Sequence, residues 1–352
     1  MTRTSTDLVP AIADLYETDL SAALLRALDN KTKPVGALGR LESLALRIGQ
    51  VLGSLQPQLS APQMLVCAGD HGLAARGVSA YPSDVTWQMV HNFLAGGAAV
   101  SVLARQHGLA LTVVDCGVRH DFEPQPGLLV RKVAPGTADA SQGPAMSAAQ
   151  CEQAIRNGRE IVRELPGNAL LLGEMGIGNT SAASLLLARL ADLPLGSCVG
   201  VGTGLDAPGL ARKRAVLAEV LALHADASSP LAALAAFGGF EIATLVGVVL
   251  EAARQRRVIV VDGFITGAAV LVAQALEPRV AQRCVAAHES AEPGHALLLR
   301  HLGLSPLLRL ELRLGEGSGA ALAWPLLESA TRILREMASF EDAGVSRQDQ
   351  AP

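Results

Sequence analysis

Five short apolar runs, each ending at a polar or glycine-rich turn, constrain the fold of this 352-residue chain more than any other feature. Their apolar character is continuous rather than alternating, which is typical of strands buried on both faces, as in a parallel sheet. Ala/Leu-rich stretches with helical character lie between them, so strand and helix alternate. The runs cover residues 64–68, 111–114, 169–172, 258–261 and 284–287, and the helical stretches include 85–106, 147–164, 181–190 and 209–223. The pattern predicts an α/β fold with a mainly parallel, Rossmann-like sheet flanked by helices, and it places ligands beyond the carboxyl ends of the strands.

The two ends of the chain lie outside this alternation. Residues 1–60 and 316–340 have helical character and are expected to pack together as a small lobe beside a large α/β catalytic domain of residues 61–315. Residues 124–145 are rich in Pro and Gly and predict a long loop. The tail 341–352 is expected to fray.

Composition excludes several classes of protein. Half of the residues are hydrophobic and only 18% are charged, which excludes a disordered chain. A net charge of −4 without a basic stripe argues against a nucleic-acid partner. The five cysteines form no CxxC pair, which predicts reduced thiols in the cytoplasm and no structural zinc. The sequence shows neither a signal peptide nor a continuous apolar run long enough for a membrane span.

Two glycine-rich turns could bind an anion. The first, GEMGIGNTS at 173–181, follows a predicted strand and opens a helix, where free backbone N–H groups suit a phosphate. It fits neither the Walker pattern nor GxGxxG, and an ordinary helix N-cap is an equally open interpretation. The second, VGVGTGLD at 199–206, is followed by Lys213. That lysine could complete an anion site, but its basic neighbours favour a solvated helix face.

A single carboxylate, Glu316, lies among glycines in LGEGSG at 314–319, after the alternating, strand-like run 308–314. Such a glutamate in a dry pocket can act as a general base. Alternatively it caps the following helix. The two interpretations predict opposite pKa shifts, because capping lowers the pKa of a carboxyl and apolar burial raises it.

Two further segments carry candidate side chains. Tyr81 and Gln88 flank a predicted helix start, and they could hold a flat heterocycle by stacking and hydrogen bonding. A Ser83-Asp84 N-cap with Tyr81 as ordinary packing is an equally open interpretation. The stretch 287–295 contains two His and two Glu without HExxH spacing, which favours a structural loop over a metal site.

Taken together, these segments resemble one family, the nicotinate-nucleotide:dimethylbenzimidazole phosphoribosyltransferases, which make the lower-ligand nucleotide of cobalamin. The resemblance runs in order from about residue 31 to 340. It is carried by KTKPVGALGRLE (31–42), AGDHG (68–72), GVSAYP (77–82), VTWQMV (85–90), NFLAGGAAV (92–100), GEMGIGNTS (173–181), GTG (202–204), VDGFI (261–265), SAEPGH (290–295) and LGEGSGAA (314–321). Two departures are small: Ala37 stands where the family usually has Ser, and Glu289 stands where a basic or neutral residue is expected.

The resemblance implies a reaction in which dimethylbenzimidazole replaces nicotinate on the ribose C1 of nicotinate mononucleotide, with inversion. It implies that Glu316 is the catalytic base, that no metal or cofactor is needed, and that the enzyme is a homodimer, with the helix near Val85 as an interface element. The implied phosphoribosyl-binding residues are Glu174, Gly176, Gly178, Asn179, Thr180, Gly202, Thr203, Gly204, Lys213 and Asp262, and the implied benzimidazole slot is Tyr81, Gln88, Met175 and Leu314.

Two other functions are considered. An NAD(P)-dependent dehydrogenase is disfavoured, because GxGxxG and the ribose-binding acid roughly twenty residues later are missing after the first strand. A non-catalytic nucleotide-binding module would bind the substrates without turnover.

Overall fold

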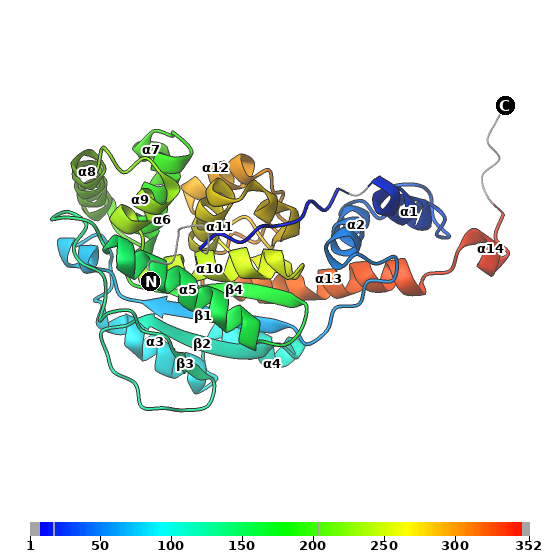
Figure 1. Ribbon diagram of the computed structural model, residues 1–352, viewed down its shortest axis with the longest axis horizontal. Coiled ribbons are helices and arrows are strands. Elements are labelled where there is room, and N and C mark those ends of the chain that lie inside the picture. Colours follow the sequence, from blue (N-terminus) through cyan, green and yellow to red (C-terminus); the bar gives the residue numbers. More distant parts are fainter. Residues whose placement is uncertain (1–7, 17, 203, 347–352) are drawn as a thin grey trace.

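The computed structural model describes residues 8–16, 18–202 and 204–346. Six parallel strands form one sheet in the order β3-β2-β1-β4-β5-β6 (Figure 1). The strands are β1 (Gln63–Gly69), β2 (Ala110–Gly117), β3 (Leu128–Val130), β4 (Ala169–Met175), β5 (Val258–Val261) and β6 (Cys284–Ala286). All five predicted apolar runs are confirmed as strands. Strand β3 was not predicted and lies within the expected long loop.

The helices fill the connections between strands and extend beyond the sheet. They are α1 (Thr18–Asp29), α2 (Arg40–Leu52), α3 (Asp84–Leu94), α4 (Ala99–His107), α5 (Ala148–Glu164), α6 (Asn179–Leu190), α7 (Leu195–Cys198), α8 (Ala207–Leu223), α9 (Pro230–Phe237), α10 (Phe240–Arg254), α11 (Phe264–Leu276), α12 (Pro293–Leu302), α13 (Ser318–Glu336) and α14 (Phe340–Ala343). The stretch 85–106 forms two helices, α3 and α4, because Gly96 between them adopts a left-handed φ of 81°. None of the described helices combines the length and the apolar character needed to cross a bilayer.

Both faces of the sheet are covered by helices, which explains why the strands have continuous apolar sequences. Successive side chains on a strand point to opposite faces. Leu65 and Cys67 of β1 therefore pack with residues of α5, α6, α9, α10 and α11. Met64 and Val66 pack with residues of α2, α3, α4 and α13 on the other face.

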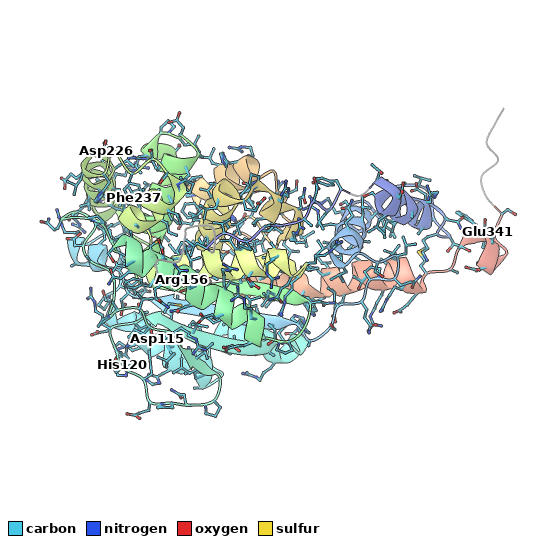
Figure 2. The ribbon with its side chains drawn as sticks, viewed as in Figure 1. Asp115, His120, Arg156, Asp226, Phe237 and Glu341 are labelled. Atoms are coloured by element: carbon cyan, nitrogen blue, oxygen red, sulfur yellow. The ribbon has the colours of Figure 1, made fainter. Side chains whose placement is uncertain are left out.

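A helical lobe extends from one end of the sheet (Figure 1). It contains α1, α2 and the far half of α13, which pack through Leu24, Ile48 and Leu334. An antiparallel bridge between Lys31 and Ser339 joins the N-terminal and C-terminal segments of the lobe. Residues 341–343 of the tail expected to fray are part of α14, and Glu341 lies at the opposite end of the molecule from His120 (Figure 2). The domain boundaries at 60, 315 and 340 stay a prediction.

Candidate active site

The turn after β4 places polar groups at the carboxyl edge of the sheet. Helix α6 begins at Asn179, two residues before the predicted start. The side-chain amide of Asn179 donates a hydrogen bond of 2.5 Å to Glu174 Oε2. A Cβ atom on Gly176 would lie 2.5 Å from the carbonyl oxygen of Gly69 at the end of β1. Only glycine therefore allows this close approach of the β1 and β4 ends, at the point where the strand order reverses.

Lys213 of α8 joins the two glycine-rich turns. Its Nζ donates to Thr180 Oγ1 at 2.9 Å and to the carbonyl oxygen of Gly200 at 3.3 Å. The side chain is fully buried, so the interpretation as a solvated basic face is wrong. Burial lowers the pKa of Lys213 to about 8, and the negative charge of Glu292 opposes that shift.

Glu316 occupies a turn of three consecutive left-handed residues. The φ angles of Gly315, Glu316 and Gly317 are 82°, 66° and 96°. The run 308–314 before it is not a strand, and the structure assigns it only a bridge between Leu308 and His288. Since Leu310 and Leu314 are both exposed, the apolar side chains of this run do not fill a sheet face.

Glu316 is buried and does not cap α13. The residue is 6% exposed, and burial raises its pKa to about 7. A hydrogen bond from the backbone of Val100 opposes this rise, and the negative charge of Asp262 adds to it. The first N–H groups of α13 are accepted instead by Asp262, from Gly317 at 3.2 Å and from Ala320 at 2.9 Å. The capping interpretation of Glu316 is therefore wrong.

Two further carboxylates near Glu316 are buried with raised pKa values. Burial raises the pKa of Glu174 to about 8, against the hydrogen bond from Asn179, and the charges of Asp262, Glu241 and Glu316 contribute to the rise. Burial also raises the pKa of Asp262 to about 7. Perturbed acids grouped beside a cavity are typical of functional sites.

A cavity of about 360 Å³ opens at this edge of the sheet. Nine of the residues predicted for the site line it: Tyr81, Glu174, Met175, Gly176, Asn179, Thr180, Gly202, Leu314 and Glu316. Tyr81 and Leu314 are 54% and 58% exposed, so they lie at its mouth. Its volume falls in the range of small-molecule sites.

Five other predicted residues do not line the cavity: Gly178, Gly204, Lys213, Asp262 and Gln88. Lys213 is bonded to Thr180, which lines the cavity, and Asp262 precedes Gly263, which also lines it. Gln88 is exposed, and Val85 and Met89 line the cavity instead, because residues four apart share one helix face. Thr203 lies outside the described residues.

Sequence reasoning missed His288, Ser290 and Glu292, which also line the cavity. They follow β6, so the rule about carboxyl strand ends could have identified them. Glu292 Oε2 is buried and has no hydrogen-bond partner among the described residues, and its charge faces Lys213. Within the described chain, no group of three or more His, Cys, Asp or Glu side chains is placed to hold a metal ion.

Comparisons with known proteins agree on one family. A model described as DBI_PRT, phosphoribosyltransferase, matches residues 14–345. The nicotinate-nucleotide–dimethylbenzimidazole phosphoribosyltransferase of Variovorax paradoxus (strain S110) is 78% identical over 98% of this chain and 99% of its own length. The protein of the same name from Dechloromonas aromatica (strain RCB) is 57% identical, over 94% of this chain and 97% of its own. The crystal structure of CobT from Thermus thermophilus superposes with a TM-score of 0.90 at 45% identity, over 94% of this chain and 100% of that one.

Proposed function

Because this chain belongs to the family of nicotinate-nucleotide–dimethylbenzimidazole phosphoribosyltransferases, we propose that it transfers phosphoribose from nicotinate mononucleotide to 5,6-dimethylbenzimidazole. The products are nicotinate and α-ribazole 5′-phosphate, and the reaction is a step of cobalamin biosynthesis. The comparisons give no support to a dehydrogenase or to a non-catalytic nucleotide-binding module. The observation that carries the proposal is the buried carboxylate of Glu316, which lines the same cavity as Gly176 and Gly202 of the two glycine-rich turns.

The two glycine-rich turns supply the phosphate site in this proposal. Thr180 and Gly202 line the cavity, and the Lys213 ammonium lies behind them, bonded to the Thr180 hydroxyl. A buried ammonium in a low-dielectric wall attracts a phosphate more strongly than an exposed one. Asn179, next to Thr180, bonds Glu174, whose carboxylate approaches Gly315 beside Glu316; we assign this pair to the ribose.

The base would enter through the apolar mouth of the cavity. Tyr81, Met89, Met175 and Leu314 line this part and could hold a flat bicyclic ring. One ring nitrogen attacks C1 of the ribose as the bond from C1 to the nicotinate nitrogen breaks, and the electron pair of that bond neutralises the pyridinium. The other ring nitrogen then loses its proton to Glu316.

The pKa of Glu316 suits this role. A carboxylate with a pKa of about 7 is a stronger base than an ordinary one and is still largely ionised slightly above neutral pH. Inversion at C1 requires no covalent intermediate, so the site needs no nucleophilic side chain. The enzyme contributes mainly by holding the two reactants in line.

We also propose that the chain is a cytoplasmic homodimer without a nucleic-acid partner. All five cysteines are free and buried, which suits a reducing compartment. The family resemblance supports the dimer, and α3, which begins beside the cavity mouth, is the proposed interface element. Light scattering of the purified chain tests the dimer, because a mass of 36.4 kDa in solution would show a monomer.

Nicotinate release tests the activity directly. The purified chain is incubated with nicotinate mononucleotide with and without dimethylbenzimidazole, and nicotinate is measured by chromatography. We expect release that depends on the base, and a binding module would saturate without release. Glu316→Gln should lower kcat by about 10²-fold or more while calorimetry still detects mononucleotide binding. Full turnover by this variant would refute the assignment of the base.

A further inference from the structure

Asp262 makes its hydrogen bonds to the protein rather than into the cavity. It follows β5 and is 1% exposed, and its two carboxylate oxygens accept the backbone N–H groups of Gly317 and Ala320 at 3.2 Å and 2.9 Å. Gly317 is the N-cap of α13 and Ala320 lies in its first turn, where backbone N–H groups have no partner within the helix. Gly263, the next residue, lines the cavity, and Asp262 does not.

The bonded turn is the one that carries Glu316. A left-handed conformation is unfavourable for a non-glycine residue, so Glu316 adopts it only where its surroundings impose it. Two contacts impose it here. Asp262 holds the backbone on the helix side, and on the strand side Gly173 packs so closely that an added Cβ would lie 2.3 Å from the Glu316 carbonyl oxygen.

We infer that Asp262 is a positioning residue for Glu316: it fixes the left-handed turn against α13 and so directs the Glu316 carboxylate at the base. This inference rests on the proposed function of Glu316. It assigns Asp262 a role that differs from contact with the ribose. It also explains why a buried aspartate at the end of β5 caps a helix that lies 55 residues later in the chain.

His288 supports the same arrangement from the far side. Its Nε2 lies 3.7 Å from Asp262 Oδ1, and its ring occupies the space that a side chain on Gly319 would fill. Burial is the main cause of the raised pKa of Glu316, and the negative charge of Asp262 adds to that rise. The charged and titratable groups that share the cavity with Glu316 are Tyr81, Glu174, His288, Glu292 and Arg313.

Asp262→Asn separates positioning from ribose contact. Its amide oxygen can keep the bond from Ala320, but its NH2 group would face the N–H of Gly317, donor against donor. We expect kcat to fall by about tenfold or more and the KM for nicotinate mononucleotide to change by less than about twofold. Because the variant also loses a negative charge beside Glu316, the acid limb of the kcat profile should move to lower pH by roughly half a unit or more.

A double variant supplies the second readout. In the Glu316→Gln variant the carboxylate that Asp262 would position is absent. Adding Asp262→Asn to this variant should therefore change its residual kcat by less than about twofold. A rise in mononucleotide KM at unchanged kcat, an unmoved acid limb, or an equal loss of kcat in both backgrounds would overturn the inference. If the wild type itself releases no nicotinate, the proposed function fails instead.

Asp115→Asn is the matched control. Asp115 lies near the end of β2 (Figure 2), is equally buried, and also accepts a backbone N–H, but that of Val118 at 2.8 Å rather than one beside Glu316. We expect this variant to retain wild-type kcat and its pH profile. Where Asp262→Asn does not fold by circular dichroism, Asp262→Ser replaces it, because serine is also a strong N-cap residue.

Discussion

Replacing Glu316 with glutamine should make the folded chain more stable above neutral pH, although it removes the proposed base. Glu316 Oε2 has no hydrogen-bond partner among the described residues, and burial raises the pKa of this carboxyl from 4.5 to about 7. A folded carboxyl that binds its proton more tightly than the unfolded one favours folding at low pH. This contribution is complete below a pH of about 4.5 and is lost as the pH rises through about 7.

The difference between those two pKa values corresponds to about 3 kcal/mol of unfolding free energy. Glutamine has the same size and no charge, so the variant avoids this loss. We therefore expect Glu316→Gln to match the wild type near pH 5 and to exceed its unfolding free energy by about 2–3 kcal/mol near pH 8.5.

Urea unfolding at about pH 5 and about pH 8.5 measures this difference. The matched control is Glu328→Gln, an exposed glutamate on the same helix, which should show no pH-dependent gain. A Glu316→Gln variant that is less stable than the wild type at the higher pH, or whose gain is equal at both, would show that burial of this carboxylate does not oppose folding.

Three further outcomes are expected. In the wild type, kcat at saturating substrate should fall about tenfold per unit below a pH of about 7, and a flat profile down to about pH 5.5 would contradict a base of raised pKa. Lys213→Ala should raise the KM for nicotinate mononucleotide more than that for the base in steady-state assays, and an effect confined to the base would remove Lys213 from the phosphate site. Glu251→Gln should lower thermal stability by about 3 kcal/mol, because the buried Glu251 carboxylate accepts from Arg159 at 3.1 Å and from Arg254; an unchanged Tm would show that this network does not stabilise the fold.

The five strands could be predicted because burial of both faces of the sheet leaves a continuous run of apolar residues in the sequence. Strand β3 was not predicted because its three residues, inside a Pro/Gly-rich loop, are too short a run to indicate a strand. The run 308–314 was wrongly predicted to be strand-like. Its alternation has the period of a strand, but Leu310 and Leu314 are exposed rather than packed on a sheet.

The candidate site was predictable in its turns but not in its long-range contacts. Glu316 and the glycine-rich turns stand out in sequence, and the structure brings them to one cavity. The buried Lys213 ammonium donates to Thr180, 33 residues away, and no local pattern of charges predicts this contact. The bond between Asp262 and Gly317 likewise joins segments that are adjacent only after the chain has folded.

Helix α13 connects the turn of Glu316 directly to the helical lobe. It starts directly after the turn of Glu316, and its 19 residues span about 28 Å. At its far end the Met337 carbonyl accepts the Lys31 ammonium at 2.6 Å. Strain applied at this Lys31–Met337 contact therefore reaches the turn of Glu316 through a single helix, so a fusion partner attached after residue 346 needs a flexible linker to leave that turn undisturbed.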